Sequence, residues 1–221
     1  MFNVPLPPLD PLSIAIRVVA AFFALILHEM VKARCSTLLG DPTPRNNGLL
    51  SGKPLKYLEP IGFIVTVIFR FGWGRPTPTS PLYYKDRKKG VIITYLTPSL
   101  VNLLVGLSAA LLVGVFTISA PQLMLGNNPA VNIAIRYGLA LLAEFARVNI
   151  GIALFNMIPV PPLDAAKLLQ IALSPNAAVK MTQNEKVLQV VLMLLLLIGV
   201  VSTVINPIIE FMVRAAAGAG F

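Results

Sequence analysis

Long apolar runs separated by short polar segments dominate the hydropathy pattern of this chain. Four runs are long enough to cross the hydrocarbon core of a bilayer as helices, at about residues 12–31, 91–118, 131–158 and 187–209. A fifth run, 61–71, is too short for a full crossing, and it contains Arg70 near its end. Such a run can lie at membrane depth when it packs against protein. The pattern predicts an all-α polytopic membrane protein with four full transmembrane helices and one short re-entrant or partial span.

Two polar segments interrupt these runs. Residues 43–59 are rich in turn-forming residues, which favours a small β-hairpin or an extended edge. Residues 159–162 form a proline-rich break, after which a helix restarts over 163–173. No internal repeat appears at a period of 20–50 residues, so residues 1–221 are expected to form a single membrane domain.

Composition agrees with a membrane protein. Of 221 residues, 56% are hydrophobic and only 12% are charged, and the mean hydropathy is +0.79. Ten of the 18 Lys and Arg residues lie between residues 33 and 89, three more lie between 160 and 186, and none lies in the 119–135 connection. The positive-inside rule then places the loops at 33–89 and 160–186 in the cytoplasm. An integral membrane protein is therefore expected.

The same distribution of charge excludes other classes. The net charge of +9 comes without a basic stripe interleaved with aromatic residues, so a nucleic-acid partner is not expected. The lipid bilayer and a transmembrane protein or membrane complex are the expected partners. Cys35 is the only cysteine, so the chain has no internal disulfide and no thiolate metal cluster.

The candidate chemistry lies near the end of the first apolar run. Residues 28–32 read His28-Glu29-Met30-Val31-Lys32, one residue away from the zinc signature H-E-x-x-H. In that signature, two histidines four residues apart bind zinc from one helix face, and the glutamate acts as general base. Here Lys32 stands in place of the second histidine, and a protonated amine cannot bind a metal.

Asp164 is the carboxylate best placed to join this group. It follows the proline-rich break, and a break at membrane depth allows a carboxylate to reach a neighbouring helix. Ionisable groups within membrane spans each cost roughly 2.5–3.5 kcal/mol, so they usually face the bundle interior and find partners there. Glu144 and Arg147, three residues apart in the 131–158 run, are expected to form a structural pair.

Six sequence blocks, in order, resemble the site-2 protease family of intramembrane zinc metalloproteases in its compact bacterial form. The blocks are His28–Lys32, Leu39–Thr43, the region 47–62, Gly72–Pro78, Leu96–Asn102 and residues 154–164. The last of these resembles L-F-N-L-L-P-I-P-P-L-D-G. Each block alone is a weak signal, but together and in family order they cover nearly the whole chain.

The resemblance implies roles for five residues. His28 matches the first zinc ligand, Glu29 the catalytic base, Asp164 the third ligand and Asn156 an asparagine near the active site, while Lys32 occupies the second-ligand position. The resemblance also implies that an extended edge in 43–59 can receive substrate backbone by strand addition, and an ordinary interfacial loop is the equally weighted alternative. The compact bacterial form that the chain resembles implies a bacterial inner membrane as the location.

Two further departures from the family pattern occur near the same positions. Ala165-Ala166 replace a glycine after the aspartate, and Leu96-Thr97 replace Ala-Gly. Changes that gather at site positions, while the other blocks persist, are typical of an enzyme that has lost its activity.

Two functions remain open from sequence. The first is a catalytically inactive relative without a metal cofactor, serving as a binding or structural subunit of a membrane complex, in which Lys32 pairs with Asp164 or Glu29 in place of zinc. The second is an active zinc protease with an atypical ligand set that cleaves transmembrane helices. For His28 alone, a hydrogen-bonded buried histidine, a remnant metal ligand and a haem or chlorophyll ligand are all considered.

Overall fold

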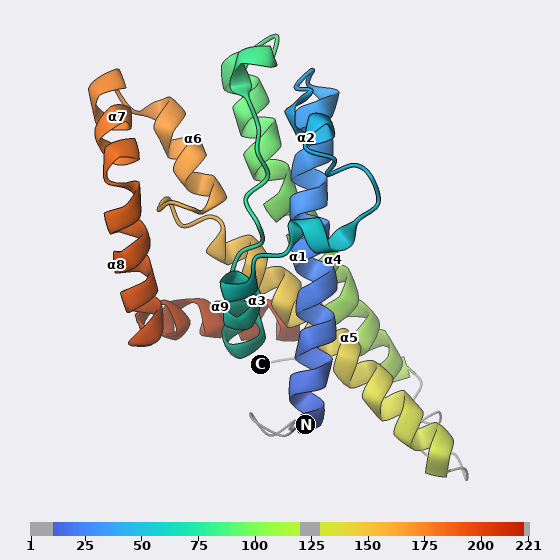
Figure 1. Cartoon of the computed structure of the whole chain (residues 1–221). Coiled ribbons are helices and arrows are strands. Elements are labelled where there is room, and N and C mark those ends of the chain that lie inside the picture. The colour runs from blue at the N-terminus through green and yellow to red at the C-terminus, as the bar shows by residue number, and fades with distance from the viewer. Residues whose placement is uncertain (1–10, 120–128, 219–221) are drawn as a thin grey trace.

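The computed structural model describes residues 11–119 and 129–218, and within them every regular element is a helix (Figure 1). The elements are α1 (Pro11–Leu38), α2 (Thr43–Asn46), η1 (Pro54–Tyr57), α3 (Pro60–Phe69), η2 (Pro81–Tyr83), α4 (Arg87–Ser119), α5 (Pro129–Phe155), α6 (Asp164–Ala172), α7 (Pro175–Gln183), α8 (Glu185–Leu197) and α9 (Val200–Ala216). The predicted all-α class is therefore confirmed. Most of the 119–135 connection and both chain ends lie outside the described residues.

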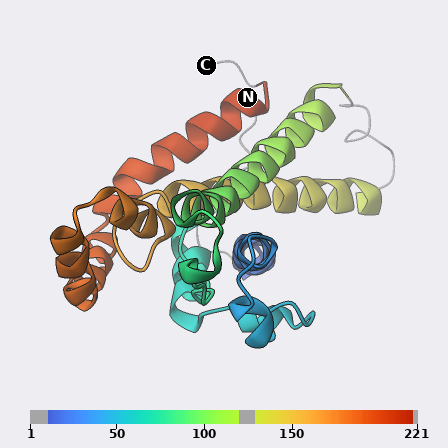
Figure 2. The same ribbon diagram turned by 90° about the horizontal axis from the view of Figure 1, so that it is seen from above.

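Helices α1, α4 and α5 pack against one another and form the centre of the molecule, and α9 packs across α4 and α5 (Figures 1 and 2). Small residues on α1 allow α5 to approach closely, since Ala20, Ala21 and Ala24 are fully buried against Val148 and Ile152. Close contact between backbones through small residues is typical of helix packing in membranes. The central helices thus form a rigid frame for the polar groups that lie between them.

The four predicted full spans are confirmed only in part. Among the described residues, α1, α4 and α5 are long and apolar enough to cross a membrane, but the fourth predicted span, 187–209, is divided between α8 and α9, which meet at a bend of 66°. Gly199, with a φ of 83°, lies at this bend, and this left-handed conformation ends α8. The pair is one broken span or a re-entrant loop.

The β-hairpin predicted over 43–59 is wrong, because the segment contains α2 and η1 and no strand. The prolines explain the difference. Pro44 and Pro54 lie in the first turn of α2 and of η1, where a fixed φ suits a helix and the missing N–H costs nothing. The turn formers that suggested a hairpin instead join these short helical turns, so the segment offers no edge strand to a substrate.

The short apolar run forms α3, a helix of 10 residues. Glu59 caps its start by accepting hydrogen bonds from the backbone N–H groups of Ile61 and Gly62, and Arg70 ends it in a left-handed conformation with a φ of 68°. An extended segment then runs from residue 71 to residue 80 and returns beside α1. This return places Thr77 against Glu29.

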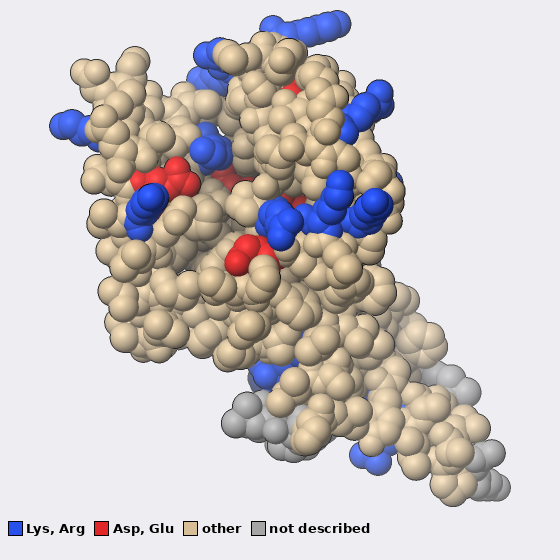
Figure 3. Space-filling view, viewed as in Figure 1, with Lys and Arg blue, Asp and Glu red and all other residues tan. Residues whose placement is uncertain are grey.

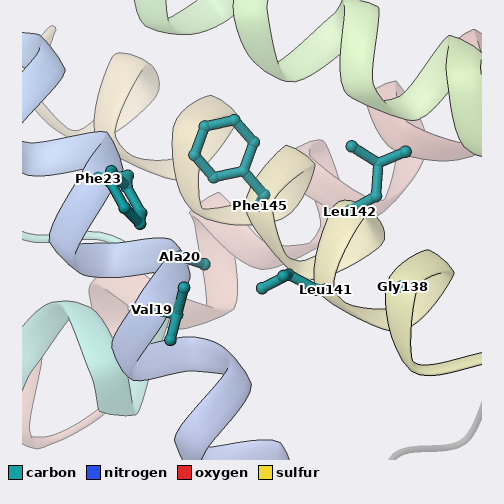
Figure 4. Close-up of a pocket in the computed structure, with 7 residues that line it drawn as sticks. All are labelled: Val19, Ala20, Phe23, Gly138, Leu141, Leu142 and Phe145. Carbon is teal, nitrogen blue, oxygen red and sulfur yellow. The ribbon is translucent and has the colours of Figure 1, made fainter. Parts of the chain in front are cut away.

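An apolar groove of about 340 Å³ lies between α1 and α5 (Figure 4). Its walls are formed by Val19, Ala20, Phe23, Gly138, Leu141, Leu142 and Phe145. No polar side chain lines it, so it presents to a membrane the same chemistry as the lipid-exposed helix faces around it.

Candidate functional site

The residues singled out from the sequence meet in a buried polar cluster between α1 and the start of α6. His28, Glu29 and Lys32 lie on one face of α1, and their exposed fractions are 1%, 3% and 3%. Asp164, the first residue of α6, is 3% exposed and faces them. The structure therefore brings together four of the five predicted site residues in direct contact.

The Lys32 ammonium lies between two carboxylates. Its Nζ is 2.7 Å from Oδ1 of Asp164 and 2.9 Å from Oε1 of Glu29. It also lies 6.0 Å from the centre of the Tyr95 ring. An ammonium has three N–H donors and no acceptor, so two charged hydrogen bonds and an aromatic neighbour account well for its burial.

His28 extends this network from Asp164 to Asn102. Its Nε2 is 3.0 Å from Oδ2 of Asp164, and its Nδ1 is 3.3 Å from Oδ1 of Asn102. The orientation of the Asn102 amide follows from its neighbours, because its Nδ2 donates to the backbone carbonyl of Ala24 and to Oδ1 of Asn149.

Both ring nitrogens of His28 consequently face oxygen acceptors. Hydrogen-bonding partners on both sides of the ring lower the cost of burying His28 with the other ionisable groups of the cluster.

Glu29 is held by the extended segment that follows α3. Its Oε2 accepts hydrogen bonds from the backbone N–H of Thr77, at 3.1 Å, and from the Thr77 hydroxyl, at 2.8 Å. Gly74 makes this approach possible, because a Cβ at that position would lie 2.7 Å from Cγ of Glu29 and 2.8 Å from the carbonyl oxygen of Tyr57. Each Glu29 oxygen is therefore already hydrogen-bonded.

Asp164 is positioned by the break after α5. The backbone carbonyl of Asn156 accepts a hydrogen bond from the N–H of Ala165, at 2.9 Å, which ties the start of α6 to the end of α5. Burial alone would raise the pKa of the Asp164 carboxyl, but the Lys32 ammonium and the His28 ring outweigh burial and hold that pKa below its ordinary value. The carboxylate form is thus the one that the cluster stabilises.

A cavity of about 90 Å³ borders the cluster. Its walls are formed by Glu29, Lys32, Trp73, Gly74, Pro76, Thr77, Tyr95, Asn156, Pro162, Asp164 and Lys167. Asn156 thus lies near the cluster, as the sequence predicts, but its Nδ2 donates to the backbone carbonyls of Ile152 and Gly72.

The donor set does not fit a zinc ion. A catalytic zinc needs three protein ligands and an open fourth position. In the described part of the chain, no group of three or more His, Cys, Asp and Glu side chains is arranged to hold a metal. Here Lys32 contributes an ammonium instead of a third ligand, and it already occupies an oxygen of Asp164.

Thr77, Asn102, Tyr95 and Lys167 belong to the site and were not among the predicted residues. Thr77 could have been found, since it lies in the block 72–78 that resembles the family. Lys167 could also have been found, because it lies three residues after Asp164 on the same helix face. Asn102 likewise lies in the block 96–102 that resembles the family, but its contact with His28, 74 positions away in sequence, comes only from the fold.

A second buried ionic cluster surrounds Glu144. Its Oε1 is 3.0 Å from Nε of Arg17 and 2.5 Å from Nε of Arg70, and its Oε2 is 3.6 Å from Nη1 of Arg147. Arg147 also pairs with Glu210 at 2.8 Å. The predicted contact between Glu144 and Arg147 exists, within a larger network that joins α1, α5 and α9 to the residue that ends α3.

Comparison with known proteins identifies the family of the chain. The model of "Peptidase family M50" matches residues 12–199. The chain is 27% identical over 205 residues to "Putative zinc metalloprotease YwhC" of Bacillus subtilis (strain 168), and the match covers 87% of this chain and 85% of the relative. No solved structure matches the chain significantly. With a family model matching most of its length, the chain belongs to peptidase family M50, the site-2 protease family.

Proposed function

We propose that this chain is a catalytically inactive site-2 protease homologue in which a buried lysine replaces the zinc ion. The observation that carries the proposal is the position of the Lys32 ammonium, 2.7 Å from Asp164 and 2.9 Å from Glu29. Asp164 matches a ligand and Glu29 the general base in the family pattern. One cation thus forms ion pairs with two groups that a zinc enzyme uses for its metal and its water.

Charge repulsion supports the same conclusion. A zinc ion next to a protonated lysine would meet a like charge in a medium of low dielectric constant, where repulsion is much stronger than in water. Hydrolysis by this family's chemistry requires a metal that lowers the pKa of its bound water to about 7. An ammonium cannot supply that function, so Glu29 has no activated water to deprotonate.

The retained fold supports a binding role. The two ion pairs of Lys32 and the hydrogen bonds of Thr77 hold α1, α6 and the extended segment together without a metal. We propose that this frame binds a transmembrane helix or serves as a structural subunit of a membrane complex. The location proposed is a bacterial inner membrane, with the basic segments 33–89 and 160–186 in the cytoplasm.

Proteolysis of a reporter transmembrane helix tests this function. Full-length wild type and the Glu29→Gln variant are co-expressed with the reporter, and the cleaved fragment is quantified. The proposal predicts the same background of cleavage with both proteins. Cleavage by the wild type that disappears in Glu29→Gln would establish the alternative, an active protease with an atypical ligand set.

A further inference from the structure

A shallow basic hollow of about 470 Å³ lies beside the start of α3. It is lined by Gly52, Lys53, Pro54, Leu55, Lys56 and Arg75. We infer that this hollow binds the phosphate-bearing headgroup of an anionic membrane lipid. The inference concerns a surface outside the buried cluster, and it stands whether or not the chain is a protease.

The hollow has three cations and no carboxylate in its walls. Within the described residues, neither Lys53, Lys56 nor Arg75 has a carboxylate partner. Lys56 donates to the backbone carbonyls of Asn47 and Gly48, both at 3.2 Å, and these carry no net charge. The positive charge of the hollow is therefore uncompensated, as an anion site requires.

The nearest acidic side chain in sequence does not neutralise it. Glu59 follows η1, but its two oxygens accept hydrogen bonds from the backbone N–H groups of Ile61 and Gly62. Its charge is thus directed at the N-terminus of α3, where the helix dipole stabilises it. A phosphate group is a better partner for the three cations, because Arg and Lys both donate charged hydrogen bonds to phosphate oxygens.

An exposed apolar stripe lies on α3, which begins at Pro60, four residues after Lys56 of the hollow. Ile61, Ile64 and Ile68 are 56%, 57% and 57% exposed, and their spacing puts them on one face of α3. Leu55, within the hollow, is 70% exposed. In Figure 3, Lys and Arg side chains gather at mid-height over the segment that precedes α3, and the surface below them is largely uncharged.

This arrangement fits a lipid better than a soluble anion. A headgroup in the hollow would leave its acyl chains beside the isoleucines of α3, so that one molecule satisfies both the charge and the apolar surface. A free phosphate would use only the charge. The short helix α3 and the basic hollow then mark the boundary between the hydrocarbon core and the headgroups of the leaflet on this side.

Native mass spectrometry of the full-length chain tests the inference. Purified protein is titrated with phosphatidylglycerol and, separately, with phosphatidylcholine, and the bound fractions are compared. We expect wild type to prefer phosphatidylglycerol by about tenfold, since each basic residue near an anionic surface contributes measurably to binding. The variant Lys53→Gln/Arg75→Gln should reduce that preference to about twofold or less.

A matched control removes the same charge elsewhere. Lys88→Gln/Lys89→Gln changes two exposed lysines at the start of α4, and it should keep the preference within about twofold of wild type. Lys56 is left intact in the test variant because it stabilises the preceding turn. An equal loss in both variants would overturn the inference in favour of diffuse attraction. Equal binding of the two lipids, or displacement of phosphatidylglycerol by an equal concentration of inorganic phosphate, would also overturn it.

Discussion

The two buried ionic clusters of this molecule differ in which charged groups they contain and in what surrounds them. The Lys32 cluster holds two carboxylates, one ammonium and a histidine with an oxygen near each ring nitrogen, and it borders a cavity. The Glu144 cluster holds three arginines and two glutamates, and it joins four segments of the chain. In both clusters buried charged groups have partners of opposite charge, but only the first is proposed to occupy the positions of a family's catalytic residues.

A buried salt bridge can therefore have two different origins. The Glu144 network is explained by packing, because a carboxylate shared by three guanidinium groups fixes α1, α5 and the end of α3 relative to one another. The Lys32 network joins residues that the sequence resemblance matches to zinc-site positions, and there we propose that Lys32 replaces the metal. We therefore expect that stability lost by a substitution in one cluster will be recovered by a different kind of second substitution than in the other cluster.

The largest expected effect is that of Lys32→Met, which removes the cation between Asp164 and Glu29. Two buried carboxylates would then face only His28, and we expect a loss of about 3–5 kcal/mol in the free energy of unfolding. Thermal unfolding of the purified protein in detergent measures this loss. A double variant, Lys32→Met/Glu29→Gln, should recover part of it. No recovery would contradict the proposed electrostatic role of Lys32.

The next effect, that of Glu144→Gln, tests the other cluster. Arg17 has a side chain only 7% exposed and would lose its carboxylate partner, so we expect a loss of about 2–3 kcal/mol. The partly exposed pair of Arg147 and Glu210 serves as the control, and Glu210→Gln should cost about 1 kcal/mol or less. Equal losses in these two variants would refute the central position of Glu144.

A third variant, Gly74→Ala, examines the packing around the first cluster alone. The added methyl group would lie 2.7 Å from Cγ of Glu29, so Glu29 or the extended segment must move, at a cost of about 1–3 kcal/mol. Gly138→Ala is the matched control, because a Cβ there has no neighbour within 4 Å. We expect the control to be neutral or to stabilise α5 by up to about 1 kcal/mol. Thermal unfolding measures both.

The smallest effect concerns a carboxylate outside both clusters. Asp41 accepts hydrogen bonds from Ser36, from the N–H of Thr43 and from the N–H of Ser80. Burial alone would raise the pKa of Asp41, but these hydrogen bonds outweigh burial and lower it. Because the pKa is lower in the folded protein, the stabilisation is present above the unfolded value of about 3.9 and is lost as pH falls through the folded pKa.

Asp41→Asn should therefore destabilise the protein by about 1–2 kcal/mol at neutral pH, with the difference shrinking below about pH 4. Unfolding curves of both proteins between neutral and acidic pH measure this. The exposed Asp86→Asn serves as the control: it can keep the hydrogen bond from the N–H of Lys89, so it should differ from wild type by less than about 1 kcal/mol at every pH. A difference between Asp41→Asn and wild type that does not change with pH would show that the charge of Asp41 is not responsible.

Much of the fold follows from the sequence, because apolar length determines which helices can cross a membrane. The bend between α8 and α9 was missed, since the run 187–209 is apolar throughout and only Gly199 marks the break. The hairpin over 43–59 was wrongly predicted, because its prolines favour the first turn of a helix as well as a loop.

The site residues divide in the same way. Some follow from spacing along the sequence, and others depend on contacts between residues far apart in the chain. His28, Glu29 and Lys32 follow from the spacing on one helix, and Asp164 from the break that precedes it. The chain of amides from Asn102 to Asn149, which determines the orientation of the Asn102 amide facing His28, depends on the packing of α4 against α5. Arg17 and Glu144 lie 127 positions apart and meet only in the folded protein.

Zinc content measured directly on the purified protein is the decisive test of whether Lys32 takes the place of the metal. Wild type and Lys32→His are prepared side by side with added zinc, and the metal bound per chain is determined by elemental analysis. The account predicts essentially no zinc in wild type and about one zinc in Lys32→His, which regains two histidines and a carboxylate. The His28→Ala/Lys32→His variant should lose that zinc. About one zinc per wild-type chain, removed by His28→Ala alone, would contradict the account.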